Sequence, residues 1–249
     1  GVLDVAPDVV GILDADGKER YGVTSLGDVY GTDSFTQEII LSEPELWSIE
    51  RPYLYTAVVR VGGSGNQYDE CRVRFGIRSI EIRPEEGFFL NGVETKFKGV
   101  CNHHDLGPLG AAVNDAAIRR QIRILKDMGC NAIRTSHNMP APELVEACDE
   151  MGMMLMLESF DEWRTPKLKN GYHKHFDEWA ERDLQNLVRH FRNNPSVVMR
   201  CIGNEVPDLL AGLKELGIDL EPVYCGGGNI DYGPREQWHS GCNFFCIEP

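Results

Sequence analysis

The chain has 249 residues, a length sufficient for one large domain or for a small domain followed by a larger one. Its 42% hydrophobic and 26% charged residues are typical of a soluble globular protein, and it lacks a run of about 18 apolar residues that could span a membrane. The net charge of −14 argues against nucleic acid or an anionic membrane surface as a partner, because both would repel the chain.

The eight cysteines are scattered along the chain, and no two of them form a CxxC pair. Several lie inside apolar runs, which indicates buried thiols in a reducing compartment rather than a metal site. The first 20 residues contain no basic segment followed by an apolar one, so no signal peptide is apparent. We expect a soluble protein without a cofactor, and both the cytoplasm and the periplasm stay open as its location.

The first 83 residues are predicted to form β-structure. Apolar and polar residues alternate in short runs at 35–41, 53–61 and 71–82. Turn residues separate these runs, for example Asp16 with Gly17 and the glycine-rich stretch 62–66. Several short strands at this spacing favour a β-sandwich.

From about residue 84 the pattern changes to strands that alternate with helices. Continuous apolar strands between amphipathic helices indicate a parallel sheet covered by helices, either a doubly wound sheet or a (β/α)₈ barrel. The strands are predicted at 95–100, 131–134, 153–157 and 196–202, and the helices at 115–128, 140–151 and 177–191.

The residues just past each predicted strand favour the barrel. These stretches, 101–105, 135–138, 158–163 and 203–205, are rich in polar, ionisable and aromatic residues. No glycine-rich phosphate loop opens any of the helices, which disfavours a nucleotide-binding fold. Barrel enzymes gather their chemistry at the carboxyl ends of successive strands.

Glu205 is the sharpest catalytic candidate. It follows the apolar run 197–203, so its carboxyl group is expected at the rim of a largely buried strand. A partly desolvated carboxyl has a raised pKa and can donate a proton to a leaving oxygen near neutral pH. The preceding Asn204 can hold a sugar hydroxyl. The alternative for a lone glutamate is a salt bridge at the rim.

Four further side chains near the predicted strand ends have either a functional or a structural interpretation. Arg134 can order neighbouring carboxylates or form a structural ion pair, and His137 either binds substrate or is a satisfied polar residue. Phe160 and Trp163 either stack on a sugar ring or pack against the protein. Their positions are read directly from the sequence.

The three residues His103, His104 and Asp105 are types that bind metal ions. No further ligand follows at a regular spacing, so hydrogen bonding to sugar hydroxyls explains them better than a metal does. Because parallel strands end on the same face, His103, Arg134, His137 and Asp161 are expected to converge with Glu205 on one rim.

A series of motifs runs through the chain in a fixed order. They are LWSIERPYLY at 46–55, RFGIR at 74–78, FLNG at 89–92, KGV at 98–100, HHD at 103–105, NAIRTSH at 131–137, CDEMG at 148–152, NPSVV at 194–198 and GNE at 203–205. With these motifs the chain resembles glycoside hydrolase family 2 over roughly residues 25–208. That family contains β-galactosidases, β-glucuronidases and β-mannosidases.

The resemblance implies an immunoglobulin-like β-sandwich, here residues 1–83, followed by a TIM-type (β/α) barrel over residues 84–249. It implies a retaining β-glycosidase that hydrolyses terminal β-linked sugars, and the HHDLG stretch at 103–107 leans towards a β-galactosidase. Glu205 matches the family's acid/base. The positions that line or organise the sugar pocket are matched by Asn204, His103, Asp105, Arg134 and His137, and we add Asp161 to this group as substrate-binding.

The sequence departs from the family in two places. Arg200 and Cys201 stand where the family usually has Trp and Ser, and an Arg200 that faced the barrel interior would alter the pocket. Only 44 residues follow Glu205, whereas each βα unit takes about 30. We therefore expect an incomplete barrel of about four units that is truncated or rearranged after about residue 208.

Retaining hydrolysis requires a second carboxylate as nucleophile. The resemblance implies that this glutamate comes from a late barrel strand, for which the chain shows no matching motif. Glu248, at the end of a strand-like run, is either this nucleophile or an incidental terminal residue. The competing hypotheses are a β-galactosidase-like hydrolase with half of its active site here, a truncated inactive relative that at most binds carbohydrate, and another barrel hydrolase. An open half-barrel exposes apolar surface, so the chain alone is expected to aggregate or to pair, and a homo-oligomer stays open.

Overall fold

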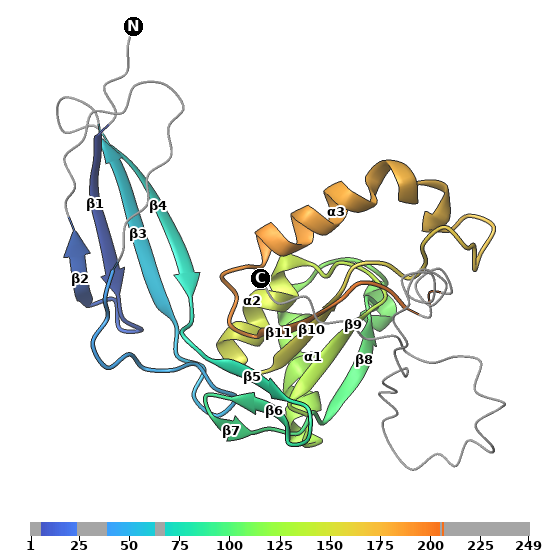
Figure 1. Cartoon of the computed structure of the whole chain (residues 1–249), viewed down its shortest axis with the longest axis horizontal. Coiled ribbons are helices and arrows are strands. Elements are labelled where there is room, and N and C mark those ends of the chain that lie inside the picture. Colours follow the sequence, from blue (N-terminus) through green and yellow to red (C-terminus); the bar gives the residue numbers. More distant parts are fainter. Residues whose placement is uncertain (1–5, 24–38, 63–67, 205, 207–249) are drawn as a thin grey trace, which may run out of the picture. The chain divides into compact units, whose positions relative to one another are not determined.

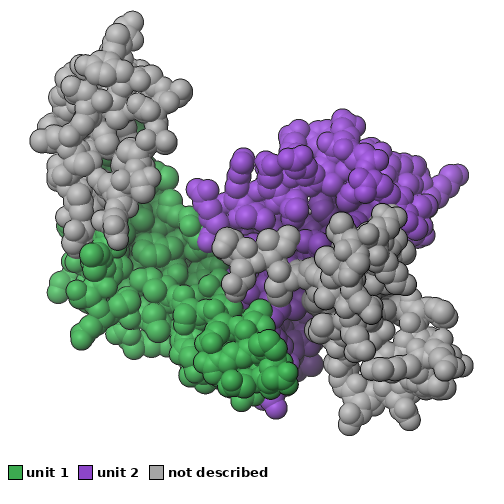
Figure 2. Space-filling view, viewed as in Figure 1, with its two compact units in different colours: residues 1–95, 193–195 green, residues 96–192, 196–249 purple. Residues whose placement is uncertain are grey.

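The computed structural model describes residues 6–23, 39–62, 68–204 and 206, and the following concerns these residues. The chain divides into two compact units, one of residues 1–95 with 193–195 and one of residues 96–192 with 196–249 (Figure 2). The domain boundary expected between residues 83 and 84 stays a prediction.

The first unit contains an antiparallel sheet in the order β2-β1-β3-β4 (Figure 1). The expected turn at Asp16 and Gly17 joins the first two strands. Asp14 Oδ1 accepts hydrogen bonds from the backbone N–H of Asp16 and of Lys18, at 3.1 and 2.9 Å, and Gly17 has a φ of 77°. The bounds are β1 Ala6–Leu13, β2 Glu19–Val23, β3 Tyr55–Gly62 and β4 Tyr68–Phe75.

The strand predicted at 71–82 is wrong, because the run is divided between two sheets. It ends β4 at Phe75 and resumes as β5 (Ile80–Arg83), which pairs with β6 (Gly87–Leu90) and then β7 (Val93–Glu94). Between them, Gly76 lies so close to Pro195 that a Cβ there would be 2.5 Å from Pro195 Cγ.

The buried Trp47 also stabilises the chain between β4 and β5, because its backbone N–H donates a hydrogen bond to the carbonyl of Ile77 over 2.7 Å. Of the strand predicted at 35–41, residues 35–38 lie outside the described residues, and residues 39–41 are not in a strand.

The second unit is a parallel sheet in the order β11-β10-β9-β8, with helices between successive strands (Figure 1). The predicted alternation of strand and helix is confirmed. The first strand is displaced from the predicted 95–100 to 99–103, and residues 93–94 pair in the sheet of the first unit. The bounds are β8 Gly99–His103, α1 Asp115–Asp127, β9 Ala132–Ser136, α2 Pro142–Met151, β10 Met154–Glu158, α3 Phe176–His190 and β11 Val197–Cys201.

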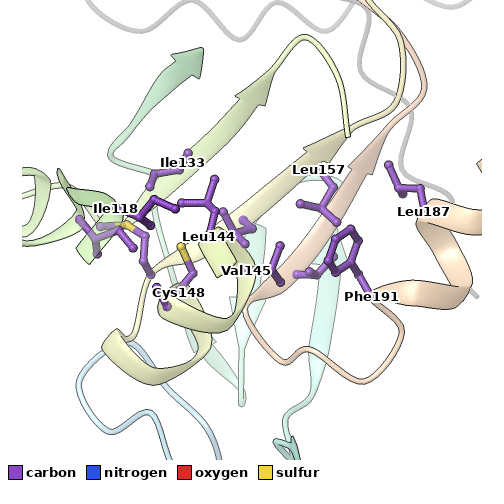
Figure 3. Close-up of a cluster of buried hydrophobic side chains, with 13 residues drawn as sticks. Ile118, Ile133, Leu144, Val145, Cys148, Leu157, Leu187 and Phe191 are labelled. Atoms are coloured by element: carbon purple, nitrogen blue, oxygen red, sulfur yellow. The ribbon is translucent and has the colours of Figure 1, made fainter. Parts of the chain in front are cut away.

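One face of this sheet packs against the helices. Every second residue of a strand faces them, and the apolar positions of the helices recur at three and four residues, so the two patterns meet in one core. Figure 3 shows side chains of all three helices gathered there. The cluster includes Ile118 and Ile122 from α1, Val145 and Cys148 from α2, Leu187 from α3 and the adjoining Phe191, with Ile133, Leu155, Leu157 and Val197 from the strands.

Local hydrogen bonds fix where the last strand begins. The buried Asp149 of α2 accepts the backbone N–H of Ser196 over 2.9 Å, directly before β11. Gly152 ends α2 in the left-handed conformation, with a φ of 68°. No helix in the part of the chain that the structure describes is long and apolar enough to cross a membrane.

Candidate active site

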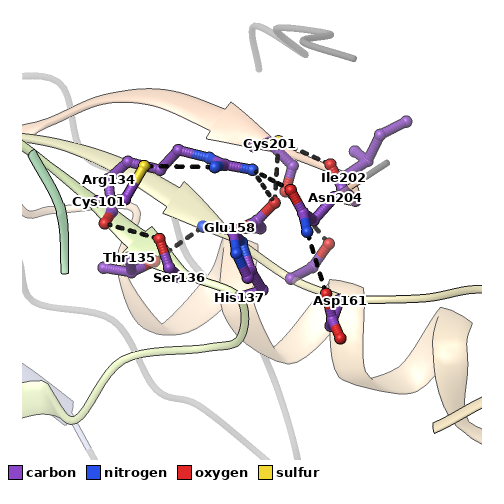
Figure 4. Close-up of polar contacts among 12 residues, drawn as sticks. Cys101, Arg134, Thr135, Ser136, His137, Glu158, Asp161, Cys201, Ile202 and Asn204 are labelled. Carbon is purple, nitrogen blue, oxygen red and sulfur yellow. Dashed lines mark hydrogen bonds and ion pairs between the residues drawn. The ribbon is translucent and has the colours of Figure 1, made fainter. Parts of the chain in front are cut away.

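Glu158 is the centre of a polar network at the carboxyl ends of the parallel strands. It is the last residue of β10, and its side chain is fully buried. Its Oε1 accepts from Arg134 Nη2 and its Oε2 from His137 Nδ1, both at 2.6 Å (Figure 4). A buried carboxylate is costly unless it is paired and hydrogen-bonded, and these two contacts supply that compensation.

Arg134 links this carboxylate to the residue that precedes Glu205. It lies in β9 and is 8% exposed, and it points away from the helix-facing core to which its neighbour Ile133 belongs. Besides Glu158, its Nη2 donates to Asn204 Oδ1 over 3.0 Å. Both interpretations of Arg134 from the sequence therefore apply, since it forms a buried ion pair and also orders its neighbours.

His137 and His103 meet at the ends of neighbouring strands. Their rings are edge to face with centroids 5.1 Å apart. Because an ionised carboxylate only accepts hydrogen bonds, His137 Nδ1 is the donor to Glu158. In the neutral ring Nε2 is then left as an acceptor, which can receive a hydrogen bond from a sugar hydroxyl. His103 also lines a small pocket with Asp105, Thr135 and Asn138.

Asn204 is held by four hydrogen bonds. Its Oδ1 accepts from Arg134, and its Nδ2 donates to Asp161 Oδ1 over 3.1 Å. Its backbone N–H donates to the carbonyl of Phe160 over 3.0 Å, and its own carbonyl accepts from Lys167 Nζ at 2.5 Å. The residue before Glu205 is thus fixed through both its side chain and its backbone.

Asp161 and Lys167, both in the chain segment after β10, are the last two members of the network. Lys167 Nζ contacts the carbonyl of Asp161 at 2.6 Å and Oδ1 of the same residue at 3.1 Å. Burial alone would raise the pKa of Asp161, but the hydrogen bonds from Asn204 and Lys167 and the charge of Lys167 lower it. Asp161 is therefore held in its charged form at neutral pH.

Glu162 stabilises the same loop through hydrogen bonds to its backbone. Glu162 is 2% exposed, and its carboxylate accepts from the backbone N–H groups of Lys167 and His173, at 2.6 and 3.0 Å, and from His173 Nδ1 at 2.8 Å. Burial raises its pKa, whereas backbone hydrogen bonds from His173, Lys167 and Leu168 and the His173 side chain prevail and lower it to about 2. Gly171 lies against it, where a Cβ would be 1.7 Å from Oε1.

The two aromatic residues proposed for sugar stacking pack within the protein. Phe160 is buried and stacks on Tyr172 with centroids 5.1 Å apart. Trp163 stacks on Phe176 at 5.6 Å, and its Nε1 donates to the carbonyl of Ile202 over 2.9 Å. One face of each ring is therefore covered by another ring, which agrees with the packing interpretation.

Five of the residues assigned from the sequence lie close together. Arg134, His137, Asp161 and Asn204 are joined directly or through Glu158, and His103 contacts His137. Asp105 lies apart from these bonds, is exposed, and accepts the backbone N–H of Gly107 over 2.6 Å. Glu205 and Glu248, the candidate acid/base and nucleophile, are outside the described residues.

Sequence reasoning missed two members of the network, Glu158 and Lys167. Glu158 directly follows the apolar run 153–157, and its place at a strand end was the available signal. Lys167 has no comparable signal, because it comes from a loop nine residues past β10 and reaches back to Asp161 and Asn204.

The concern that Arg200 faces the barrel interior is wrong. In the parallel register Arg200 is opposite Leu157, and Cys201 is opposite Glu158. Opposite residues of parallel strands point to the same face, so Arg200 shares the helix-facing side with Leu157. Burial there lowers the pKa of Arg200. Cys201 instead faces the network, with its Sγ 3.6 Å from Glu158 Oε1.

Among the residues that the structure describes, no three His, Cys, Asp or Glu side chains gather in a way that could hold a metal ion. The network around the buried Glu158 consists of oriented hydrogen-bond donors and acceptors. Such groups suit recognition of a polyhydroxylated molecule and support of a proton transfer.

Comparison with known proteins identifies the family. The description "Glycosyl hydrolases family 2" matches residues 9–78, and "Glycosyl hydrolases family 2, TIM barrel domain" matches residues 80–224. The chain belongs to glycosyl hydrolases family 2. The family resemblance is thereby confirmed, together with an immunoglobulin-like domain and a TIM barrel domain, whereas the incomplete barrel stays a prediction.

Relatives within the family have two named activities. The β-galactosidase BoGH2A of Bacteroides ovatus is 47% identical over 212 residues, which are 84% of this chain and 25% of that protein. A β-glucuronidase of Streptococcus agalactiae serotype V is 32% identical over 201 residues, which are 75% of this chain and 33% of that protein.

A solved structure agrees with this assignment. A glycosyl hydrolase family 2 member from Bacteroides cellulosilyticus is 36% identical, with a TM-score of 0.76 over 92% of this chain and 31% of its own length. The chain thus spans between a quarter and a third of the length of these three proteins.

Proposed function

We propose that the protein carrying this chain is a retaining β-glycosidase that hydrolyses terminal β-linked galactose. The observation that carries the proposal is family membership combined with a polar network at the carboxyl ends of the barrel strands. Barrel enzymes bind and transform their substrates at that face. In this proposal Glu205 is the acid/base, and it directly follows an asparagine anchored by four hydrogen bonds.

In the proposed reaction Glu205 protonates the glycosidic oxygen while a second carboxylate attacks the anomeric carbon. Glu205 then removes a proton from the water that hydrolyses the glycosyl-enzyme intermediate. We assign His103, Asp105, His137, Asp161 and Asn204 to the binding of sugar hydroxyls, and Arg134 to the ordering of Glu158 and Asn204. The nucleophile is either a glutamate of a late barrel strand, as the family resemblance implies, or Glu248 of this chain.

The sugar is proposed from two observations. The β-galactosidase of Bacteroides ovatus is 47% identical to this chain, and the β-glucuronidase of Streptococcus agalactiae is 32% identical. A glucuronide carries a carboxylate, which is bound most strongly by a cationic side chain. In the described network Arg134 is bonded to Glu158 and Asn204, and Lys167 directs its three donors at oxygens of Asp161 and Asn204. A neutral sugar therefore suits this network better.

A β-glucuronidase is the second candidate, because relatives with that name share the fold and the family. Chromogenic β-galactoside, β-glucuronide and β-mannoside, tested with the full-length protein, separate the candidates. We expect the highest kcat/KM on the galactoside, and a higher value on the glucuronide would overturn the choice of sugar. A folded, pure protein that hydrolyses none of them would instead favour the inactive, carbohydrate-binding relative.

The stereochemical course tests the retaining mechanism separately. Proton NMR of an early reaction mixture should show the β-anomer of the free sugar before mutarotation, as a double displacement requires. Initial release of the α-anomer would contradict the retaining assignment without affecting the choice of sugar.

A further inference from the structure

Lys167 is the basic group through which the loop after β10 contacts the residue before Glu205. Its Nζ contacts the carbonyl of Asn204 at 2.5 Å, the carbonyl of Asp161 at 2.6 Å and Asp161 Oδ1 at 3.1 Å. An ammonium group has three donors, and each of them has an oxygen in range here. The side chain therefore joins two strand ends at one point.

The backbone of Lys167 is fixed by a hydrogen bond to the buried Glu162. Its backbone N–H donates to Oε2 of the buried Glu162 over 2.6 Å, and the other oxygen of that carboxylate accepts from His173. The backbone of the loop is thereby held at Lys167 and again at His173. A lysine on a fixed backbone, with all three donors directed at oxygens, holds its partners in one arrangement.

Asn204 is contacted by three different side chains. Arg134 holds the amide oxygen of Asn204, and Asp161 accepts from the amide nitrogen. Lys167 holds the backbone carbonyl of Asn204, which belongs to the peptide bond that leads to residue 205. That carbonyl is thus held by a side chain from the loop after β10.

We propose that Lys167 is a positioning residue for the acid/base of this enzyme, acting through the Asn204 carbonyl and Asp161. This inference rests on the proposed function of Glu205. Lys167 does not touch the reacting atoms in this proposal. It fixes the peptide from which the acid/base projects, and the loop after β10 thereby contributes to proton transfer.

The degree of exposure separates this role from a merely stabilising one. The side chains of Lys167 and Asp161 are 26% and 44% exposed, and ion pairs this open to water contribute little to stability. Loss of the ammonium group should therefore leave the protein folded while it changes the geometry at Asn204. Lys167→Met removes the charge and keeps a linear side chain.

Leaving-group dependence provides the test in the full-length protein. A poor leaving group, as in phenyl β-galactoside, needs a well-placed acid, whereas a dinitrophenolate leaves without protonation. We expect Lys167→Met to lower kcat/KM about tenfold or more on the phenyl galactoside and less than about twofold on the dinitrophenyl galactoside, because acid/base help is at stake only in the first. An equal loss on both substrates, or no loss on either, would overturn the proposal.

Lys169 provides a matched control in the same loop. It is exposed and makes no ion pair with any residue within the described ranges. We expect Lys169→Met to keep kcat/KM within about twofold of the parent on both substrates, as surface changes away from the network should. Leaving-group sensitivity in this variant equal to that of Lys167→Met would show a general loop effect and overturn the specific role.

A double-mutant cycle distinguishes failure of this inference from failure of the proposed function. If Lys167 acts partly through Asp161, the losses caused by Lys167→Met and Asp161→Asn on the phenyl galactoside should not add. A parent protein that hydrolyses no β-glycoside would refute the proposed function and the positioning role together. An active parent with additive losses would refute only the coupling between these two residues.

Discussion

Arg134 Nη2 lies 2.6 Å from Glu158 Oε1, and both side chains are almost entirely removed from solvent. The pair joins two neighbouring strands, β9 and β10, on the face of the sheet opposite the helices. Because the same guanidinium nitrogen also reaches Asn204, the carboxylate of Glu158 determines where Arg134 holds that asparagine.

Replacement of Glu158 by Gln should destabilise the protein strongly. The amide keeps the shape but removes the carboxylate charge that pairs with the buried Arg134, and loss of one partner of a buried pair costs about 3–5 kcal/mol. Urea unfolding of Glu158→Gln measures this cost. The exposed Glu146 of α2 gives the control, since Glu146→Gln should change the free energy of unfolding by less than about 0.5 kcal/mol. Equal stability of the two variants would contradict the central place of Glu158.

Replacement of Glu205 by Gln should abolish most hydrolysis and leave the fold intact. The amide cannot donate the proton, and general acid/base catalysis contributes about 10²–10⁴ in rate. Steady-state kinetics on a galactoside with a poor leaving group measures the loss, and Glu178→Gln, an exposed change on α3, is the control. Activity of Glu205→Gln within about twofold of the parent would refute its assignment as acid/base.

The stability contributed by Glu162 should depend on pH. Its pKa is lowered from 4.5 to about 2 in the folded protein, so the folded state favours the charged carboxylate. The contribution is therefore fully present above about pH 4.5 and is lost as pH falls towards 2. We expect the difference in melting temperature between the parent and Glu162→Gln to be larger near pH 7 than near pH 3. A difference independent of pH would show that the charge of Glu162 is not what stabilises the loop.

Gly171 should not tolerate a side chain while Glu162 is present. Its φ of −78° suits any residue, so the obstacle is steric, with a Cβ 1.7 Å from Glu162 Oε1. Gly171→Ala must displace a carboxylate that accepts several hydrogen bonds, at a cost of about 1–3 kcal/mol. In the Glu162→Ala background the same change should be nearly neutral. If it costs the same in both backgrounds, the conflict with Glu162 is not its cause.

Much of the second unit could be predicted from the sequence, because its signals are local and periodic. Apolar strands such as 153–157 and the helical spacing of Ile118 and Ile122 indicate which side chains form the core. Parallel strands then bring their ends together, which is why His103, Arg134, His137 and Asp161 could be grouped in advance.

The failures of prediction came from contacts between distant parts of the chain. The run 71–82 alternates like one strand, and its break at Gly76 depends on Pro195, more than a hundred residues later. The face to which Arg200 points depends on the register shift between Leu155 and Met156 against β11. Local alternation contains no information about either feature.

The two anchors of the loop after β10 also define where this region can vary during evolution or engineering. Glu162 holds the backbone at Lys167 and again at His173, while the side chains of residues 168–170 between them are exposed. Loops with fixed ends and exposed centres accept new side chains without loss of the scaffold. A library of substitutions at 168–170 could therefore diversify the loop while Asp161 and Asn204 keep their positions.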